Sequence, residues 1–261
     1  MNNYILPLIL TLCAGMSTLL GGFVTFFIKR NNLKALSVGL GFSAGVMIYV
    51  SLGNLMGEAS EMLTAYYSVI PAKALSFAGF FIGIIIAIII DYFIPDHIET
   101  DFLNNQNKCK QRHRIRRAGL ITAIAVTLHN FPEGMATFLV SSQDLRLGIP
   151  VAIAIAIHNI PEGIAIALPI FHATGKKRLA ILYSFVSGIS EPIGGLIGVL
   201  LLKTIMPEQA VGFMTAAVAG IMVYLSFDTL LPLSREYGEN HHVIIGIITG
   251  MLIMSLGLIF L

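Results

Sequence analysis

One short segment of the sequence occurs twice, and both copies carry residue types that bind metal cations. Residues 128–134 read Leu-His-Asn-Phe-Pro-Glu-Gly, and residues 157–163 read Ile-His-Asn-Ile-Pro-Glu-Gly, 29 positions further along. The candidate ligands are His129, Asn130 and Glu133 in the first copy, and His158, Asn159 and Glu162 in the second. Helical residues three and four positions apart share a face, so each glutamate has a histidine and an asparagine beside it. The repeat therefore predicts a cation-binding constellation that is formed twice.

A proline stands next to each glutamate of the repeat and next to a third glutamate, Glu191, in the segment Ser190-Glu191-Pro192. Because proline has no amide hydrogen, Pro132, Pro161 and Pro192 each leave the carbonyl four residues earlier without its helical partner. We therefore expect three kinked or loosened helices, each with a carboxylate close to the irregularity.

The composition is that of a polytopic membrane protein. The chain has 261 residues, of which 56% are hydrophobic and 11% charged, and its mean hydropathy is +0.84. Soluble domains have about 25% charged residues. The two cysteines are too few for a disulfide framework. The N-terminus lacks the basic region of a secretory signal, so we interpret the first apolar run as a retained span.

Eight runs of about 20 apolar residues are long enough to cross a bilayer. They cover roughly residues 4–28, 35–57, 75–94, 118–141, 148–171, 179–202, 209–232 and 242–261. We expect an all-α fold, a single transmembrane domain over residues 1–261, in which eight helices form the bundle. Spans 4 and 5 carry the two copies of the repeat.

The distribution of positive charge predicts the orientation in the membrane. Of the 16 lysine and arginine residues, 13 fall in the odd-numbered connections between spans. Positive charge marks the cytoplasmic side, so both termini are expected outside the cell and the loop 95–117 in the cytoplasm.

The two histidines of the repeat lie at matching depths. His129 is 11 residues into span 4 and His158 is 10 residues into span 5. At 1.5 Å per residue both are about 15–17 Å deep, near the middle of a ~30 Å core. Glu191 reaches a similar depth in span 6. A lone buried histidine is most often a packing residue, but packing does not explain seven such polar residues, and intramembrane ionisable groups usually mark function.

The function of the polar residues outside the repeat and Glu191 can be interpreted in two ways in each case. The loop 95–117, whose basic run includes His113, is either a solvated, positively charged connection or a weak metal-sensing or metal-delivering site at His97 and its acidic neighbours. Glu58 and Glu61, at the outer end of span 2, either gather cations or are ordinary interfacial residues. Asp91 and Asp228 either line an exit or end their helices.

The doubled repeat together with Ser190-Glu191-Pro192 resembles the ZIP (Zrt/Irt-like) family of divalent-metal transporters, in particular its bacterial ZupT-type branch. The resemblance covers nearly the whole chain, including eight spans and a histidine-bearing third connection. It implies a fold in which spans 1–3 and 6–8 are related units around spans 4 and 5.

The resemblance also implies a transport site that can hold two metals. One position would be formed by His129, Glu133, His158, Glu162 and Glu191. The other would be formed by Asn130, Glu133, Asn159 and Glu162, with the glutamates bridging. Many family members have an acidic residue where this chain has Asn159, which lowers the charge of the second position.

The sequence therefore predicts uptake of Zn²⁺, and also of Fe²⁺ and Mn²⁺, across the inner (cytoplasmic) membrane by alternating access. The alternatives are a metal-dependent intramembrane enzyme with a di-metal centre and a metal-selective channel. The enzyme is disfavoured because no His-Glu-x-x-His segment supplies a base. The expected partners are the transported cations and the lipid bilayer, with no prosthetic group and no nucleic acid. A homodimer, the coupling ion and the physiological metal are left open.

The predicted orientation is testable by cysteine labelling of intact cells. A membrane-impermeant maleimide added outside should label Ser142→Cys or Gln143→Cys variants, because both residues lie in an expected outer connection. It should not label the native Cys109 until the membrane is made permeable. Labelling of Cys109 alone in intact cells would reverse the assignment.

Overall fold

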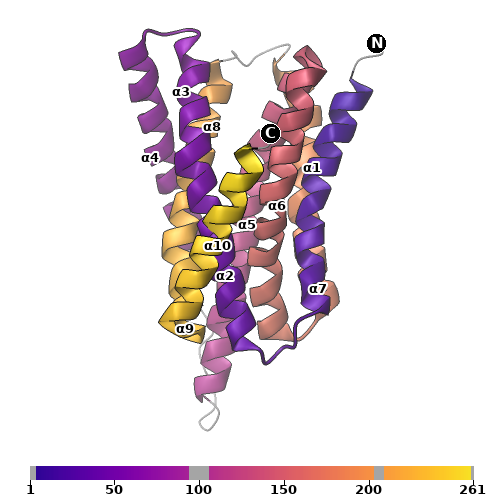
Figure 1. The fold of residues 1–261 in the computed structure, drawn as a ribbon, viewed down its shortest axis with the longest axis vertical. Helices are drawn as coiled ribbons and strands as arrows, with labels where there is room; N and C mark the ends of the chain where they lie inside the picture. The colour runs from indigo at the N-terminus through magenta and orange to yellow at the C-terminus, as the bar shows by residue number, and fades with distance from the viewer. Residues whose placement is uncertain (1–3, 94–105, 203–208, 260–261) are drawn as a thin grey trace.

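The protein is a bundle of long helices. The computed structural model describes residues 4–93, 106–202 and 209–259, and it contains no strand within these ranges. The helices run side by side along the longest axis of the molecule, and the two ends of the described chain lie toward the same end of the bundle (Figure 1). This arrangement is that of an all-α, polytopic protein, as the sequence predicts.

Each span consists of one helix or of consecutive helical segments. The bounds are α1 Ile5–Phe23 with the 3₁₀ turn η1 Val24–Phe26; α2 Leu33–Val50, the π-helical turn η2 Ser51–Leu55 and α3 Met56–Thr64; α4 Val69–Phe93; α5 Gln106–Gln143; α6 Leu145–Thr174; α7 Lys177–Leu202; α8 Gln209–Tyr224, the π-helical turn η3 Leu225–Leu230 and α9 Leu231–Tyr237; and α10 Asn240–Ile259.

Seven of these spans are long and apolar enough to cross a membrane. The eighth, α5, has 38 residues but contains the first copy of the repeat and a basic N-terminal part, which lower its hydropathy. It lies inside the bundle between the other helices (Figure 1). The eight predicted spans are therefore all present as helices.

The structure corrects three boundaries that the sequence predicts. Span 2 continues to Thr64 and not only to about residue 57, and span 3 begins at Val69 and not near residue 75. Residues 106–117, which the sequence assigns to the loop 95–117, form the first turns of α5. The helix continues because its charged residues find partners on neighbouring spans: Arg117 contacts Asp91 on α4 at 3.2 Å, and Arg114 contacts Glu236 on α9 at 3.1 Å. His97 and its acidic neighbours lie outside the described residues.

The three prolines do not divide their helices. Pro132 lies inside α5, Pro161 inside α6 and Pro192 inside α7, and each helix continues on both sides. Pro161 is also held by a neighbouring helix, since the hydroxyl of Ser43 on α2 donates to its carbonyl at 2.6 Å. The irregular turns occur instead at η2 and η3, in the middle of spans 2 and 7.

The helix contacts have an internal two-fold relation. The helix α1 packs on α6 as α7 packs on α5, and α2 packs on α10 as α8 packs on α4. Exchanging spans 1–3 with spans 6–8, and α5 with α6, reproduces these contacts. The π-helical turns obey the same exchange, since Ser51 in η2 donates to Met47 and Ser226 in η3 donates to Met222. The observed packing thus has the grouping that the family resemblance implied.

The glycine that ends each copy of the repeat explains how α5 and α6 fit against their neighbours. A side chain at Gly134 would overlap the carbonyl of Glu191 on α7, and one at Gly163 would overlap the carbonyl of Thr18 on α1. Small residues allow such close packing of membrane helices. The repeat therefore fixes helix packing as well as supplying polar side chains.

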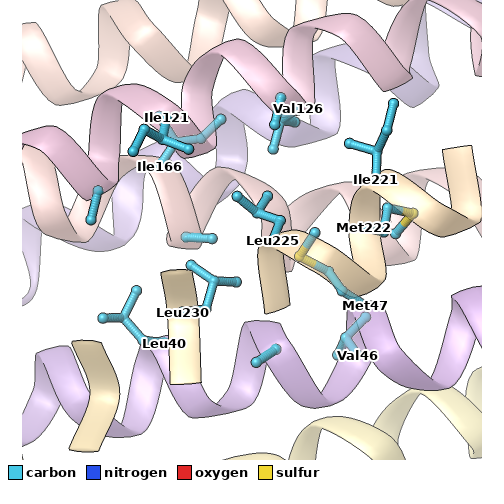
Figure 2. Close-up of a cluster of buried hydrophobic side chains, with 14 of the residues drawn as sticks. Leu40, Val46, Met47, Ile121, Val126, Ile166, Ile221, Met222, Leu225 and Leu230 are labelled. Carbon is cyan, nitrogen blue, oxygen red and sulfur yellow. The ribbon is translucent and has the colours of Figure 1, made fainter. Parts of the chain in front are cut away.

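Apolar side chains fill the bundle on one side of the repeat (Figure 2). Ile121 on α5 and Ile166 on α6 lie two turns from the histidines, toward the end where α5 begins. They belong to one buried cluster with Leu40 on α2 and with Leu225 and Leu230 on η3. These apolar side chains lie between the repeat and the end of the bundle where α5 begins.

Close glycine packing between spans can be tested at Gly83 on α4. A methyl group there would overlap the carbonyl of Ala217 on α8, so Gly83→Ala should destabilise the purified protein by about 1–3 kcal/mol. The matched control is Gly57→Ala, because nothing lies within 4 Å of that position. Thermal unfolding in detergent should show a lower midpoint for Gly83→Ala only. Equal midpoints for the two variants would contradict this packing.

Candidate metal-transport site

All seven residues that the sequence singled out lie in the interior of the bundle. The helix α5 supplies His129, Asn130 and Glu133; α6 supplies His158, Asn159 and Glu162; and α7 supplies Glu191. None of them is more than 6% exposed. Charged and polar groups at this depth are stable only with polar partners or a bound ion, so their contacts decide what the site does.

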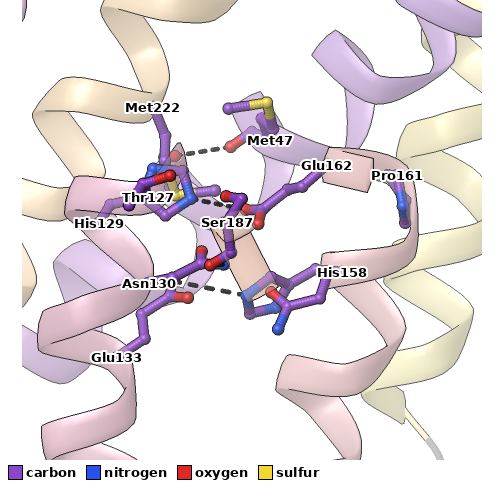
Figure 3. Close-up of polar contacts among 12 residues, drawn as sticks. Met47, Thr127, His129, Asn130, Glu133, His158, Pro161, Glu162, Ser187 and Met222 are labelled. Carbon is purple, nitrogen blue, oxygen red and sulfur yellow. Dashed lines mark hydrogen bonds and ion pairs between the residues drawn. The ribbon is translucent and has the colours of Figure 1, made fainter. Parts of the chain in front are cut away.

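The histidines and glutamates of the two copies pair crosswise between α5 and α6 (Figure 3). His129 Nε2 lies 3.0 Å from Glu162 Oε1, and His158 Nε2 lies 3.5 Å from Glu133 Oε1. The sequence predicted neighbours along each helix, whereas these polar contacts join the two helices. The antiparallel packing of α5 on α6 causes this exchange, because it brings each histidine opposite the glutamate of the other copy.

The two asparagines attach the site to α1 and α7. Asn159 Nδ2 donates to the carbonyl of Ala14 at 3.0 Å and to Glu191 Oε2 at 2.7 Å. Asn130 Nδ2 donates to the carbonyl of Ser187 at 3.2 Å. The amide nitrogen of each asparagine thus donates to a backbone carbonyl of a neighbouring helix. Each oxygen, which is the atom that binds cations, stays free for another partner.

Every one of the seven residues keeps at least one buried polar atom that has no hydrogen-bond partner among the described residues. These atoms are His129 Nδ1, Asn130 Oδ1, both carboxylate oxygens of Glu133, His158 Nε2, Asn159 Oδ1, Glu162 Oε2 and Glu191 Oε1. Leaving one such atom unsatisfied costs about 1–3 kcal/mol. So many together indicate a site built to receive a ligand, and the ligand suited to nitrogen and carboxylate donors is a metal cation.

The side chains are held in pairs and do not yet converge on one point. Within the described ranges, no three His, Cys, Asp or Glu side chains are gathered as a metal-coordinating group. A cation entering this site would therefore replace the histidine–glutamate contacts with bonds to itself.

A cavity of about 150 Å³ adjoins this site on the side toward the end of α5. Its inner wall includes Glu133 and His158, and its outer part includes Asn54 and Glu58 of span 2. Asn54 Nδ2 donates to Glu58 Oε1 at 2.7 Å. Glu58 therefore lines the same cavity as Glu133 and His158. Glu61 lines a separate groove between α3 and α4.

The acidic residues at the other end of the bundle lie together. Asp91 and Asp228 line a second cavity with Glu236 and with two of the four arginines of α5, Arg114 and Arg117. Asp91 is paired with Arg117, so it is not a free cation ligand in this conformation. His113 lies near this end on α5 and is partly buried.

Three residues of the site environment were not singled out from the sequence. The carbonyls of Ala14 and Ser187 hold the asparagines, and backbone groups carry no signal in residue type. Asn54 could have been found, because it precedes Glu58 by four residues and therefore shares its helix face.

Comparison with known proteins shows the family to which the chain belongs. A family model described as "ZIP Zinc transporter" matches residues 95–257. The chain belongs to the ZIP family. A protein of Clostridium perfringens named "Zinc transporter ZupT" is 44% identical and covers 99% of this chain and 97% of its own length. A protein of Streptococcus mutans with the same name is 48% identical, with 96% of each chain covered.

Membership of the ZIP family decides between two of the functions left open by the sequence. The chain is a transporter rather than an intramembrane enzyme. It is a membrane protein, in keeping with its several helices long and apolar enough to span a bilayer.

The buried carboxylates predict that metal and protons compete. Glu133, Glu162 and Glu191 would carry a formal charge of −3 if all were ionised, so the metal-free site should hold at least one shared proton. Zn²⁺ binding to the purified protein should release protons, and its affinity should fall as the pH drops below neutral.

Calorimetry in two buffers that differ in their heats of ionisation measures this proton release. His241→Gln is the control, because that histidine is exposed on α10 and should leave the release unchanged. Zn²⁺ binding without proton release, together with an affinity that stays constant from acid to neutral pH, would contradict a protonated metal-free site.

Proposed function

We propose that this protein takes up Zn²⁺ across the cytoplasmic membrane through the site between α5, α6 and α7. The observation that carries the proposal is the set of buried His, Asn and Glu atoms without partners at the centre of the bundle. The relatives that the chain matches over nearly its full length are named as zinc transporters, which supports the same cation.

The two metal positions that we propose are those implied by the family resemblance. The first would be formed by His129, Glu133, His158, Glu162 and Glu191, whose free atoms lie on three adjoining helices. The second would be formed by Asn130 and Asn159 through their unpartnered oxygens, with Glu133 and Glu162 bridging. The mixture of imidazole, carboxylate and amide donors suits Zn²⁺ and also Fe²⁺ and Mn²⁺, so we propose that all three are transported.

Transport would proceed by alternating access. The site is reached by a cavity from one end, while the apolar cluster around Ile121, Ile166 and Leu225 fills the other. A channel needs a continuous path, whereas a carrier needs one side closed at a time. The distribution of lysine and arginine supports an orientation in which the open side and both termini face the outside of the cell.

The central prediction is that Glu133→Ala and Glu162→Ala each abolish metal uptake. Each change removes one carboxylate of a crosswise pair and leaves the opposite histidine without its partner. Zn²⁺ uptake into proteoliposomes should fall to the level of empty liposomes, while elution as a folded protein in detergent is retained. Glu239→Ala is the control, because that glutamate is exposed between α9 and α10, and its uptake should match the wild type.

The same preparation distinguishes a carrier from a channel and tests the range of metals. A carrier saturates with external Zn²⁺, and Fe²⁺ and Mn²⁺ should compete for uptake. Near-normal uptake by either glutamate variant would show that the metal path lies elsewhere. A flux that rises linearly with Zn²⁺ would favour the channel.

A further inference from the structure

The hydroxyl of Thr18, on α1, is a buried polar group that the site described above does not use. Its side chain is 0% exposed, and Oγ1 has no hydrogen-bond partner among the described residues. Threonines in membrane helices normally satisfy this hydroxyl locally, through the carbonyl of the preceding turn. Thr11, Thr122, Thr137 and Thr215 all do so here, at 2.8–3.0 Å from the carbonyl four residues earlier. Thr18 therefore lacks the local hydrogen bond to the carbonyl four residues earlier that these other buried threonines make.

The carbonyl that Thr18 would use belongs to Ala14, and it already accepts two hydrogen bonds, one from the hydroxyl of Ser17 at 2.6 Å and one from Asn159. Asn159 Nδ2 donates to that carbonyl at 3.0 Å. The same amide donates to Glu191 Oε2 at 2.7 Å. Thr18 thus lies one helical turn from an atom that is in direct contact with a predicted metal ligand, and its hydroxyl is left for another partner.

The internal two-fold relation places Thr18 opposite Glu191. Gly134 of the first copy packs on the carbonyl of Glu191, and Gly163 of the second copy packs on the carbonyl of Thr18. Likewise, Asn130 donates to Ser187, four residues before Glu191, while Asn159 donates to Ala14, four residues before Thr18. Gly15 on α1 and Gly188 on α7 pack on each other's carbonyls, so they are counterparts in the two-fold relation. Thr18 is therefore the counterpart on α1 of a carboxylate on α7.

We propose that Thr18 is an additional oxygen ligand of the transported cation, binding it directly or through one water. This inference rests on the proposed function. The hydroxyl would complete the site on the side of α1, where Asn130 Oδ1 and Asn159 Oδ1 also lack partners. Because the hydroxyl is neutral, it adds a donor without adding a fourth buried negative charge, and a moderately held metal can still leave.

The test compares Zn²⁺ binding to purified, full-length variants by calorimetry. Thr18→Val keeps the shape of the side chain and removes the hydroxyl, so Zn²⁺ affinity should fall about tenfold, as for the loss of one polar contact. Thr18→Ser keeps the hydroxyl and should bind within about twofold of the wild type. Thr11→Val is the matched control, because that threonine is equally buried on α1 and its hydroxyl is satisfied by Pro7.

Thermal unfolding and Zn²⁺ uptake by the same proteins separate the remaining outcomes. Wild-type affinity in Thr18→Val would overturn the inference. So would an equal loss of affinity in Thr18→Val and Thr11→Val accompanied by lower unfolding midpoints, since that result means a packing role. Failure of the wild type to move Zn²⁺ into proteoliposomes, with the binding difference intact, would overturn the proposed function and leave the Thr18 ligand standing.

Discussion

The burial of three carboxylates at the centre of an apolar bundle is the constraint on which the rest of this structure depends. Glu162 and Glu191 are 0% exposed, and Glu133 is 6% exposed. A charge in such surroundings is costly unless an opposite charge, a donor or an ion compensates it. The histidines and asparagines supply part of that compensation, and the partnerless atoms that remain define what a cation would supply. The packing of α1, α5, α6 and α7 holds all of these groups at one depth.

The repeat performs two tasks with one set of residues. Its polar members form the site, and its glycines let α5 approach α7 and α6 approach α1 until backbones touch. The internal two-fold relation makes these contacts equivalent, so the site is built from two similar halves. It is not fully symmetric, because Glu191 stands on α7 where α1 has Thr18. A cation bound between the halves would therefore meet more negative charge on the side of α7.

The arrangement also indicates which parts of the protein must move. The cavity that ends at Glu133 and His158 and the apolar cluster around Ile121 and Ile166 lie on opposite sides of the same residues. Packed side chains resist gradual deformation, so the proposed alternating access would require helices to separate as units. The π-helical turns η2 and η3 lie in spans 2 and 7, beside this cluster. Leu225 and Leu230 are residues of η3 and also members of the cluster.

The sequence by itself determined the membrane-spanning class, the number of spans and the identity of the seven polar residues. These follow from local properties, namely apolar run length, proline position and the spacing of His, Asn and Glu. The tertiary structure decided how those residues pair. Whether His129 contacts Glu133 or Glu162 depends on how α5 and α6 pack together, and no spacing within one helix specifies that. For the same reason the carbonyls of Ala14 and Ser187, the helical start of α5 at Gln106 and the unsatisfied hydroxyl of Thr18 emerged only from the packed bundle. Each of them depends on a contact between residues far apart in the chain.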